Sequence, residues 1–338
     1  MKISSNYNLK PHNTFGIEAK CNLFIEFSDE NELQEALTRV KESNLPFLIL
    51  GEGSNLLLTG DYEGIVLHSD IKGIEATETE DGILVKAGSG VVWDELVEHC
   101  INNGWHGLEN LSYIPGTVGA SAVQNIGAYG CEAKDAIYNI EAIEIETGTK
   151  HVISNSDCNY SYRHSKFKAE WKNKFVITNV TYKLSSAFTP HIDYGNIKDE
   201  LTKRGYGLTP DAKQLREIII DIRKTKLPEP EIEGNAGSFF MNPIVERCVY
   251  ENLAKSYPEM PHYTISNESE KIPAGWLIEK CGWKGRSLGK AGVHDKQALV
   301  LVNRGGATGQ DILRLCNTIR EDVKTKFDIT IVPEVNIL

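Results

Sequence analysis

The sequence has no long apolar run and no apolar N-terminal segment. None of its 338 residues belongs to a stretch of about 18 consecutive apolar residues, the length that a membrane-spanning helix requires. The first residues, MKISSNYNLKPHNTFG, also lack the apolar core of a signal peptide. We therefore expect a cytoplasmic protein that neither spans nor binds a membrane.

The cysteines lack the spacing of a metal site or a redox pair. Seven of them are scattered between Cys21 and Cys316, with no C-x-x-C motif and no histidine at ligand spacing. In a cytoplasmic protein such cysteines are usually free thiols. The pattern predicts free, buried thiols and no metal.

Basic residues are scarce relative to acidic ones. Lysine and arginine number 36 against 47 aspartates and glutamates, which gives a formal net charge of −11. A general nucleic-acid binder usually has the opposite balance, so we expect no nucleic-acid partner. The composition, 41% hydrophobic and 25% charged, is that of a globular protein, and the length predicts two or three domains.

Strands alternate with helices in every part of the chain, which predicts an α+β or α/β organisation. Pro210 is predicted at the first position of a helix that follows Thr209, and the stretch at 227–230 is a plausible domain boundary. In chain order we first predict a strand at 22–27, a helix capped by Ser28 and Asp29 with Leu33, Ala36, Leu37 and Val40 on one face, and within 47–58 a second strand that runs straight into a glycine-rich turn. There follow a strand at 83–87, a helix at 92–101, a hairpin at 140–153 turning at Gly148, a strand at 175–184 and the helix from Pro210 to about Lys224. The last predicted elements are helices at 244–255, 274–280 and 309–327, and strands at 298–303 and 329–338.

Two short glycine turns follow predicted strands. Backbone N–H groups at Gly51-Glu52-Gly53-Ser54-Asn55 could point into one concavity that binds phosphate, although an ordinary tight turn is the alternative. A dinucleotide fingerprint is excluded because Leu56 stands where its third glycine should be, and Gly88-Ser89-Gly90 has Trp93 at that place. No phosphate loop of the G-x-x-x-x-G-K-[ST] type occurs.

A third glycine-rich segment spans residues 114–130. Small residues alternate there with apolar ones without the periodicity of a helix or strand. Long loops of this kind usually serve a function. The segment predicts backbone packed closely around a flat, polar cofactor, and a buried structural loop is the alternative.

These segments, taken together and in order, resemble the UDP-N-acetylenolpyruvoylglucosamine reductase family, in its longer subtype with a substrate-binding tyrosine loop. The resemblance spans nearly the whole chain, and the combination is specific although no single segment is. The matching segments are Asn13-Thr14-Phe15-Gly16, residues 51–55, Pro115-Gly116 through Gly130, Tyr162-Arg163, Gly234-Asn235-Ala236-Gly237-Ser238-Phe239-Phe240, residues 274–278 and Pro333-Glu334-Val335.

The resemblance implies an α+β, FAD-binding fold of the vanillyl-alcohol-oxidase type with a third, substrate-binding α+β domain. It implies a first FAD-binding subdomain at 1–70, joined by the last strand at 329–338, a second at 71–222, and the substrate-binding domain at 223–328. FAD would bind non-covalently. The residues implied to line it are Gly51, Glu52, Gly53, Ser54, Asn55, Pro115, Gly116, Gly119, Ala120, Gln124, Asn125, Gly127, Ala128 and Tyr129.

The implied reaction reduces UDP-N-acetylglucosamine enolpyruvate to UDP-N-acetylmuramate in bacterial peptidoglycan synthesis, with NADPH as the reductant of FAD. By the resemblance, Ser238 is the proton donor, and Glu334 and Arg163 polarise the substrate carboxyl group and stabilise the intermediate. Without the resemblance, Ser238 is typical of a turn and Arg163 of a surface. Glu334, in an apolar run, lies either at an exposed strand edge or in a site that raises its pKa.

An anionic sugar nucleotide needs a local basic site in a protein of net charge −11. The cluster Arg223-Lys224-Thr225-Lys226 is the densest one near the glycine-rich segment, although a solvated helix end is the alternative. Met241 replaces a lysine that is common in the family, which makes substrate affinity less certain. The residues that the resemblance implies in substrate binding, with Arg223 added on charge, are Tyr194, Arg223, Lys226, Asn242, Tyr263 and Gln297.

Two rival functions remain open on the sequence. One is an FAD oxidase or dehydrogenase of the same fold that acts on another substrate and needs no pairing of Ser238 with Glu334. The other is a non-enzymatic nucleotide-binding sensor. The oligomeric state is left open, with a monomer as one possibility.

Overall fold

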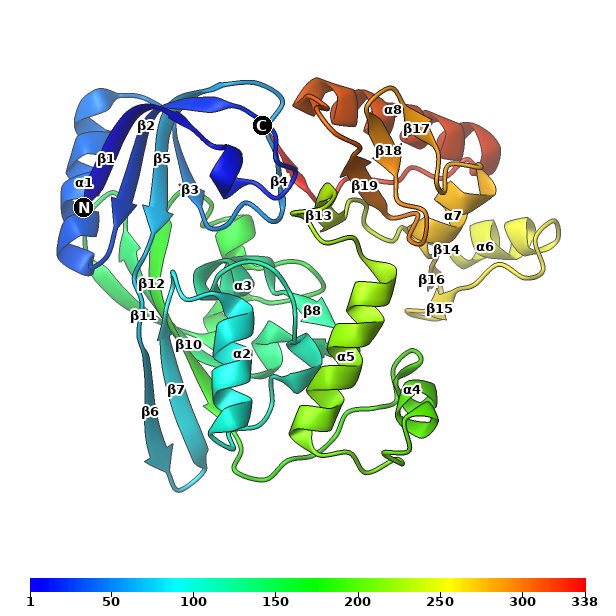
Figure 1. Ribbon diagram of the computed structural model, residues 1–338, viewed down its shortest axis with the longest axis horizontal. Coiled ribbons are helices and arrows are strands. Elements are labelled where there is room, and N and C mark those ends of the chain that lie inside the picture. Colours follow the sequence, from blue (N-terminus) through cyan, green and yellow to red (C-terminus); the bar gives the residue numbers. More distant parts are fainter. The chain divides into compact units, whose positions relative to one another are not determined.

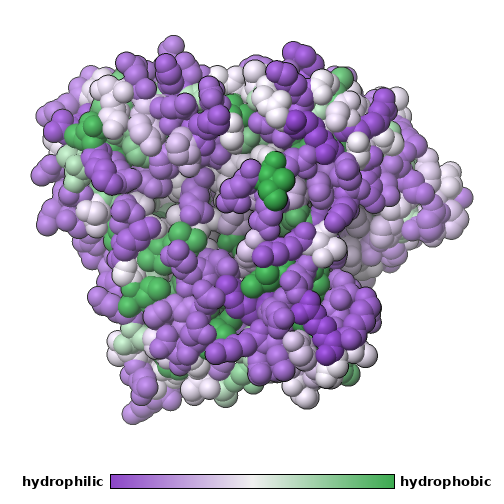
Figure 2. Space-filling view, in the orientation of Figure 1, coloured by the Kyte–Doolittle hydropathy of each residue, from purple (hydrophilic) through white to green (hydrophobic).

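The chain folds into two compact units that are interleaved in sequence. The computed structural model describes all 338 residues. The first unit contains residues 1–7, 21–52 and 63–223, and the second contains 8–20, 53–62 and 224–338. Figure 1 shows the elements in chain order. Figure 2 shows that most of the visible surface is hydrophilic, with apolar residues in small scattered groups.

The first unit begins with a four-stranded sheet covered by one helix. Asp29 caps this helix by accepting the N–H of Glu32. The predicted strand at 22–27 and the buried face of the predicted helix are both confirmed. The sheet order is β1 (Lys2–Asn8), β2 (Lys20–Phe27), β5 (Tyr62–Ser69) and β3 (Phe47–Leu50), and the helix is α1 (Glu30–Ser43).

The second sheet of this unit is antiparallel. The predicted hairpin is confirmed, because β10 and β11 pair across the turn that contains Gly148, whose φ is +73°. The sheet order is β11 (Lys150–Ser154), β10 (Ile137–Glu144), β12 (Phe175–Leu184), β7 (Gly82–Gly88) and β6 (Ile74–Thr79). The helices of the unit, beside α1, are α2 (Trp93–Asn102), α3 (Val118–Gln124), α4 (Ile197–Lys203) and α5 (Ala212–Lys226), of which α5 continues three residues past the unit's end.

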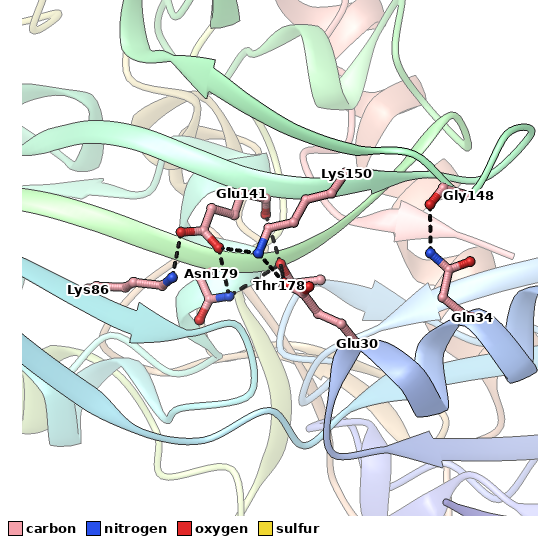
Figure 3. A network of polar contacts seen from close by, with 8 residues as sticks. All are labelled: Glu30, Gln34, Lys86, Glu141, Gly148, Lys150, Thr178 and Asn179. Atoms are coloured by element: carbon pink, nitrogen blue, oxygen red, sulfur yellow. Dashed lines mark hydrogen bonds and ion pairs between the residues drawn. The ribbon is translucent and has the colours of Figure 1, made fainter.

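A polar network joins α1 to this antiparallel sheet (Figure 3). Lys150 Nζ lies 2.7 Å from Glu30 Oε1 and 2.8 Å from Glu141 Oε2. Lys86 Nζ lies 2.5 Å from the other oxygen of Glu141, and the buried Thr178 hydroxyl donates to Glu30. Alternating charges therefore tie α1 to the antiparallel sheet, and Leu33 of α1 and Ile143 of β10 also share one apolar core.

The second unit contains three helices, two small antiparallel sheets and one pair of short parallel strands. The predicted helix at 309–327 is confirmed, with Thr308 and Asp311 forming a reciprocal cap at its start. One antiparallel sheet has the order β13 (Gly234–Ser238), β19 (Val300–Asn303), β18 (Ala291–Val293) and β17 (Ser287–Leu288). The other has the order β14 (Ile244–Glu246), β16 (Ser269–Lys271) and β15 (Tyr263–Thr264). The helices are α6 (Arg247–Ala254), α7 (Ala274–Lys280) and α8 (Gly309–Phe327).

The last strand is shorter than predicted. Only Asn336–Ile337 form β20, which pairs in parallel with β4 (Leu56–Leu57). Pro333 has no N–H to donate to a ladder. The backbone from Val332 to Glu334 instead pairs irregularly with the segment that follows β13. The prediction of Glu334 within a regular strand is therefore wrong.

Two other predicted helix starts differ from the structure. α5 begins at Ala212 rather than Pro210, because Asp211 and Gln214 cap it by accepting each other's backbone N–H. Residues 244–246 form strand β14, so α6 begins only at Arg247.

All seven cysteines are free, but they are not all buried. Cys21, Cys100, Cys158 and Cys316 are buried as predicted, whereas Cys248 is exposed. It lies in α6, a helix with no buried residue. No helix has the length and apolar character needed to cross a membrane.

Candidate active site

In the first unit, Gly51 and Glu52 of the first glycine turn lie against the segment at 114–130, which also contacts the turn at 88–90. A Cβ added to Gly51 would come within 3.0 Å of Thr117 Oγ1, and one added to Gly119 within 2.9 Å of Ser89 Cβ. The N–H of Gly119 also donates to Ser89 O at 3.0 Å. Close packing against Thr117 and Ser89 therefore explains why side chains are absent at these positions.

Part of the segment at 114–130 is helical, so the prediction of a loop without secondary structure is wrong there. Thr117 caps α3 by accepting the N–H of Ala120, and Asn125 ends the helix with a φ of +45°. Val118, Ser121 and Ala122 are buried at helical spacing. A threonine followed by that spacing was the available signal, but the glycine and alanine between them obscured it.

Glu52 ties the first glycine turn to the third. Its Oε2 accepts the N–H of Gly116 at 2.9 Å. Burial raises the pKa of the Glu52 carboxyl, an effect that the hydrogen bond from Gly116 only partly offsets. The side chain of Glu52 therefore organises the loop at Pro115-Gly116.

The turn at 51–53 fits a ligand that carries phosphate. The backbone N–H groups of Gly51, Glu52 and Gly53 donate no hydrogen bond within the protein, and Gly53 is buried. Successive free N–H groups on one turn form an anion-binding concavity. A buried N–H without a partner is costly unless a ligand or water supplies an acceptor. These donors suit the pyrophosphate of a dinucleotide such as FAD.

Tyr129 and Tyr194 lie together at the end of the third segment. Their rings are 6.5 Å apart and nearly perpendicular, and Tyr194 also lies over Gly130. The buried amide of Asn110 donates to Tyr129 O at 3.1 Å and to His191 O at 2.8 Å. Asn110 therefore holds the third glycine-rich segment and the loop before Tyr194 in one arrangement.

Arg163 occupies a strained turn. Ser161 and His164 pair as an isolated antiparallel bridge, and Tyr162 and Arg163 form the turn between them. The φ of Arg163 is +54°, which is uncommon for a residue other than glycine and occurs often at functional sites. Its Nη2 donates to Gly127 O at 2.9 Å. The guanidinium is thereby directed to the third glycine-rich segment.

Arg223, on α5, is the second cation in this region. Its Nε donates to Tyr113 O at 2.9 Å. Burial lowers the pKa of Arg223, against the raising influence of Tyr129 and Asp94, and the charge of Arg163 contributes to the lowering. Two arginines that interact electrostatically across a partly buried region form a site suited to an anion.

A bidentate ion pair supports the position of Arg223. Arg216, seven residues earlier on α5, lies 2.6 and 2.8 Å from the two oxygens of Asp94 on α2. Asp94 also accepts the N–H of Tyr113 at 2.5 Å. Asp94, Arg216 and Asn110 were not predicted, because each has the pattern of an ordinary helix or loop residue and finds its partner far along the chain.

In the second unit, Ser238 and Glu334 come together. The N–H of Glu334 donates to Phe239 O at 2.8 Å, so Glu334 lies beside the residue that follows Ser238. Ser238 is exposed, and its hydroxyl forms no hydrogen bond within the protein. Phe239 and Phe240 behind it are 0% and 1% exposed. The hydroxyl is therefore accessible to solvent or a ligand, and the two residues that follow it in the chain are buried phenylalanines.

Asn55 and Gln297 flank this pair. Asn55 O accepts two hydrogen bonds from Asn336, at 3.2 Å from its backbone and 3.1 Å from its side chain, and Asn55 Nδ2 lies 3.5 Å from Glu334 O. Gln297 O accepts the N–H of Val300, the register partner of Ser238. The second unit thus gathers Ser238, Glu334, Asn55 and Gln297.

Asn242 and Gln297 both approach the start of α7, since a Cβ added to Gly275 would come within 3.3 Å of Gln297 Oε1. Asn242 Oδ1 caps α7 by accepting the N–H of Ala274 at 2.9 Å. Tyr263, on β15, is 52% exposed with Lys271 Nζ 5.5 Å from its ring centroid. Lys226 is exposed at the end of α5.

Comparison with known proteins identifies the family. A curated relative from Bacteroides fragilis, named UDP-N-acetylenolpyruvoylglucosamine reductase, is 51% identical over 337 residues, covering 99% of this chain and 100% of the relative. The chain belongs to the UDP-N-acetylenolpyruvoylglucosamine reductase family. Relatives of the same name from Flavobacterium johnsoniae and Pseudomonas aeruginosa are 46% and 42% identical, cover 100% of this chain, and are themselves covered to 100% and 99%.

Two family profiles and one solved structure agree with this membership. The profile "UDP-N-acetylenolpyruvoylglucosamine reductase, C-terminal domain" matches residues 229–338, and the profile "FAD binding domain" matches 22–154, which include the glycine-rich segments. The crystal structure of the Thermus caldophilus member has a TM-score of 0.68 at 22% identity, covering 99% of this chain and 98% of that chain. The predicted family and its α+β, FAD-binding fold of the vanillyl-alcohol-oxidase type are confirmed.

Proposed function

We propose that this protein reduces UDP-N-acetylglucosamine enolpyruvate to UDP-N-acetylmuramate in peptidoglycan synthesis, with FAD as a non-covalent cofactor and NADPH as its reductant. The observation that carries the proposal is the backbone pairing of Phe239 with Glu334, which brings Ser238 and Glu334 together in a member of this reductase family. The sugar nucleotide and NADPH are the small-molecule partners. The location is cytoplasmic and the protein acts as a monomer in this proposal.

FAD would be held by the backbone of the glycine-rich segments. The free N–H groups at residues 51–53 suit its pyrophosphate, and the segment 115–130 suits the flat flavin. When bound, FAD supplies the hydride. We propose the subdomains 1–70 with 329–338 and 71–222 as the parts that hold it, and 223–328 as the substrate-binding domain.

Ser238 and Glu334 would complete the reduction. Hydride addition to the methylene carbon leaves negative charge on the carbon that bears the carboxylate, and a proton must be added there. The Ser238 hydroxyl has no competing hydrogen bond within the protein, so it is available to donate that proton. Because a serine is a weak acid, the charge that develops in the substrate and the neighbouring Glu334 must assist the transfer.

Arg163 and Arg223 would bind anionic groups of the substrate. A guanidinium makes two-point contacts with a carboxylate or phosphate. Arg163 is assigned to the carboxylate that carries the developing charge, and Arg223 to substrate binding together with Tyr194, Lys226, Asn242, Tyr263 and Gln297. Their charges offset locally the net charge of −11.

The test is stopped-flow absorbance of the bound flavin in Ser238→Ala. We expect NADPH to bleach the variant at nearly the rate of the unmodified protein, whereas reoxidation by the enolpyruvyl sugar nucleotide slows by about 10² to 10⁴-fold, the typical contribution of a positioned proton donor. Ser287→Ala, an exposed serine in the same sheet, is the control and should change neither step.

Three outcomes would contradict the proposal. A protein that binds no FAD would remove the cofactor assignment. Equal slowing of both steps in Ser238→Ala would indicate a structural role for this residue. Rapid reoxidation of the reduced flavin by other acceptors, with none by the enolpyruvyl substrate, would favour an oxidase of the same fold.

A further inference from the structure

Asn125 lies in the segment assigned to FAD, yet its side chain is fully used within the protein. It is 0% exposed. Its Nδ2 donates to Ser161 O at 2.9 Å and lies 3.3 Å from Glu132 Oε2, and its Oδ1 accepts the N–H of Lys134 at 3.0 Å. Both amide protons and the carbonyl oxygen therefore have partners. Because the residue is also fully buried, no group of this side chain is exposed to a cofactor.

We propose that Asn125 is a positioning residue for Arg163 and contributes no side-chain contact to FAD. The bond from Asn125 goes to Ser161, which closes the base of the turn that carries Arg163. The proposal rests on the role of Arg163 in the proposed function.

The turn needs external support because its backbone is strained. A left-handed conformation at Arg163 costs free energy and persists only where surrounding contacts determine it. The structure supplies a contact at each end of the residue: Asn125 holds the base of the turn, and Gly127 O accepts from the guanidinium at 2.9 Å. Residues 125 and 127 thus fix both the backbone and the charged group of Arg163.

Gly127 shows how little room the guanidinium has. A Cβ at this position would lie 3.3 Å from Arg163 Nη1 and 3.0 Å from Cys131 O. The neighbouring acid, Glu132, is paired with Lys134 Nζ at 2.8 Å as well as with Asn125. Lys134 therefore offsets part of the charge of the Glu132 carboxylate.

At position 125, only an amide side chain can both donate to Ser161 O and accept from the N–H of Lys134. The position requires an acceptor for the N–H of Lys134 and a donor for Ser161 O. An aspartate has the same shape and keeps the first contact, but its second oxygen would face the Ser161 carbonyl without a proton. Asn125→Asp therefore removes the link to the Arg163 turn while changing few atoms.

The experiment uses the FAD-loaded full chain with Asn125→Asp and Asn125→Ala. Flavin affinity is measured by fluorescence titration, and the two flavin steps by stopped-flow absorbance. We expect the Kd for FAD and the rate of bleaching by NADPH to change by less than about twofold. Reoxidation by the enolpyruvyl sugar nucleotide should slow by about 10 to 100-fold, the effect of misplacing a positioned group by about 1 Å.

Asn155→Ala is the matched control. Its amide also donates to two backbone carbonyls nearby, Lys134 O and Ile137 O, each at 2.7 Å, but has no bond to the Arg163 turn. We expect normal reoxidation in this variant. Slowing equal to that in Asn125→Ala would overturn the proposal, because loss of any local amide would then suffice.

A double-mutant cycle separates positioning from general structure. If Asn125 acts through Arg163, then Asn125→Ala adds almost nothing to the slowing already caused by Arg163→Ala. Additive effects, or a weakened affinity for FAD, would overturn the proposal and leave the proposed function intact. Normal reoxidation in Arg163→Ala alone would overturn both the role of Arg163 and this proposal.

A second variant covers the case in which Asn125 substitutions do not fold. Gly127→Ala leaves Asn125 unchanged and places a methyl group against the guanidinium. Slower reoxidation is expected, whether or not the affinity for FAD changes, because residue 127 also lies in the segment assigned to the cofactor. Reoxidation at the rate of the unmodified protein would contradict the inference.

Discussion

At the scale of single residues, several polar side chains of the candidate site bind other parts of the protein. The carboxylate of Glu52 accepts from Gly116, the carbonyl of Asn242 caps α7, and the amide of Asn125 joins three backbone segments. Each residue type is chemically able to contact a ligand. The hydrogen bonds show that these groups first build the loops that would surround one.

Glu52→Gln tests the state of the buried carboxyl. Burial raises the folded-state pKa of Glu52 above its usual value of 4.5, so the folded state binds this proton more tightly than the unfolded state. Its contribution to stability is present in acid and is lost as pH rises through the raised pKa. We expect Glu52→Gln to raise the unfolding midpoint by about 1 to 3 °C at pH 8, with the difference closing near pH 4.

Thermal unfolding of the FAD-loaded protein across this pH range provides the measurement. Glu35→Gln, at an exposed position of α1, serves as the control and should show no such trend. A variant of Glu52 that is less stable at pH 8 would mean that the ionised carboxylate gains more from Gly116 than burial costs.

At the scale of elements, buried contacts and one polar network set how α1 and the antiparallel sheet join. Glu141 on β10 lies between Lys86 on β7 and Lys150 on β11, and Lys150 reaches Glu30 at the start of α1 (Figure 3). Burial alone would raise the pKa of Glu141, but the hydrogen bonds and charges of the two lysines outweigh it and lower the pKa. The network therefore stabilises the first unit only while Glu141 is ionised.

Glu141→Gln should destabilise the protein in a pH-dependent way. A carboxyl with a lowered folded-state pKa contributes stability above its unfolded pKa, and this contribution is lost as pH falls through the folded pKa. We expect a loss of about 1 kcal/mol at pH 7 after solvent screening, or about 2 to 4 °C in the unfolding midpoint. The difference should shrink below about pH 4.

Unfolding midpoints of the variant and of Glu78→Gln, an exposed residue on β6, are compared between pH 7 and pH 3.5. A constant difference at every pH would show that lost packing, and not the charge of Glu141, causes the effect.

At the scale of the whole molecule, the second unit is assembled from three stretches of chain. Phe15, Ile17 and Leu57, from residues 8–20 and 53–62, are buried in the same core as α7 and α8. The N–H of Asn235 donates to Thr14 O, and β4 pairs with β20. The segment matched by the C-terminal family profile, 229–338, is therefore only part of the unit that contains it.

A fragment of residues 224–338 should not fold cooperatively alone. It lacks three buried residues of its core and the partner strand of its last strand. Removing one large buried side chain typically costs about 3 to 5 kcal/mol, and the whole stability of a domain is about 5 to 15 kcal/mol. Thermal unfolding followed by circular dichroism should show no sharp transition in the fragment, in contrast to the full chain. A cooperative transition near that of the full chain would contradict this expectation.

The sequence by itself determined the elements with strong local signals and the family. The apolar face of α1, the bounds of α8 and the turn at Gly148 follow from periodicity, capping and glycine. It was unreliable where signals were weak or mixed, as in α3, whose cap was hidden among glycines, and at Glu334, where proline interrupts an apolar run.

Only the tertiary structure decided which polar groups meet. Asn125 donates a hydrogen bond to Ser161, Asn110 donates one to His191, and Asp94 accepts one from Arg216. The partners are 36, 81 and 122 residues apart in the sequence. Ser238 and Glu334 come together only because the chain after β13 pairs with the chain before β20. Hydrogen bonds act over about 3 Å, so their partners depend on how distant segments pack, and no local pattern of residues contains that information.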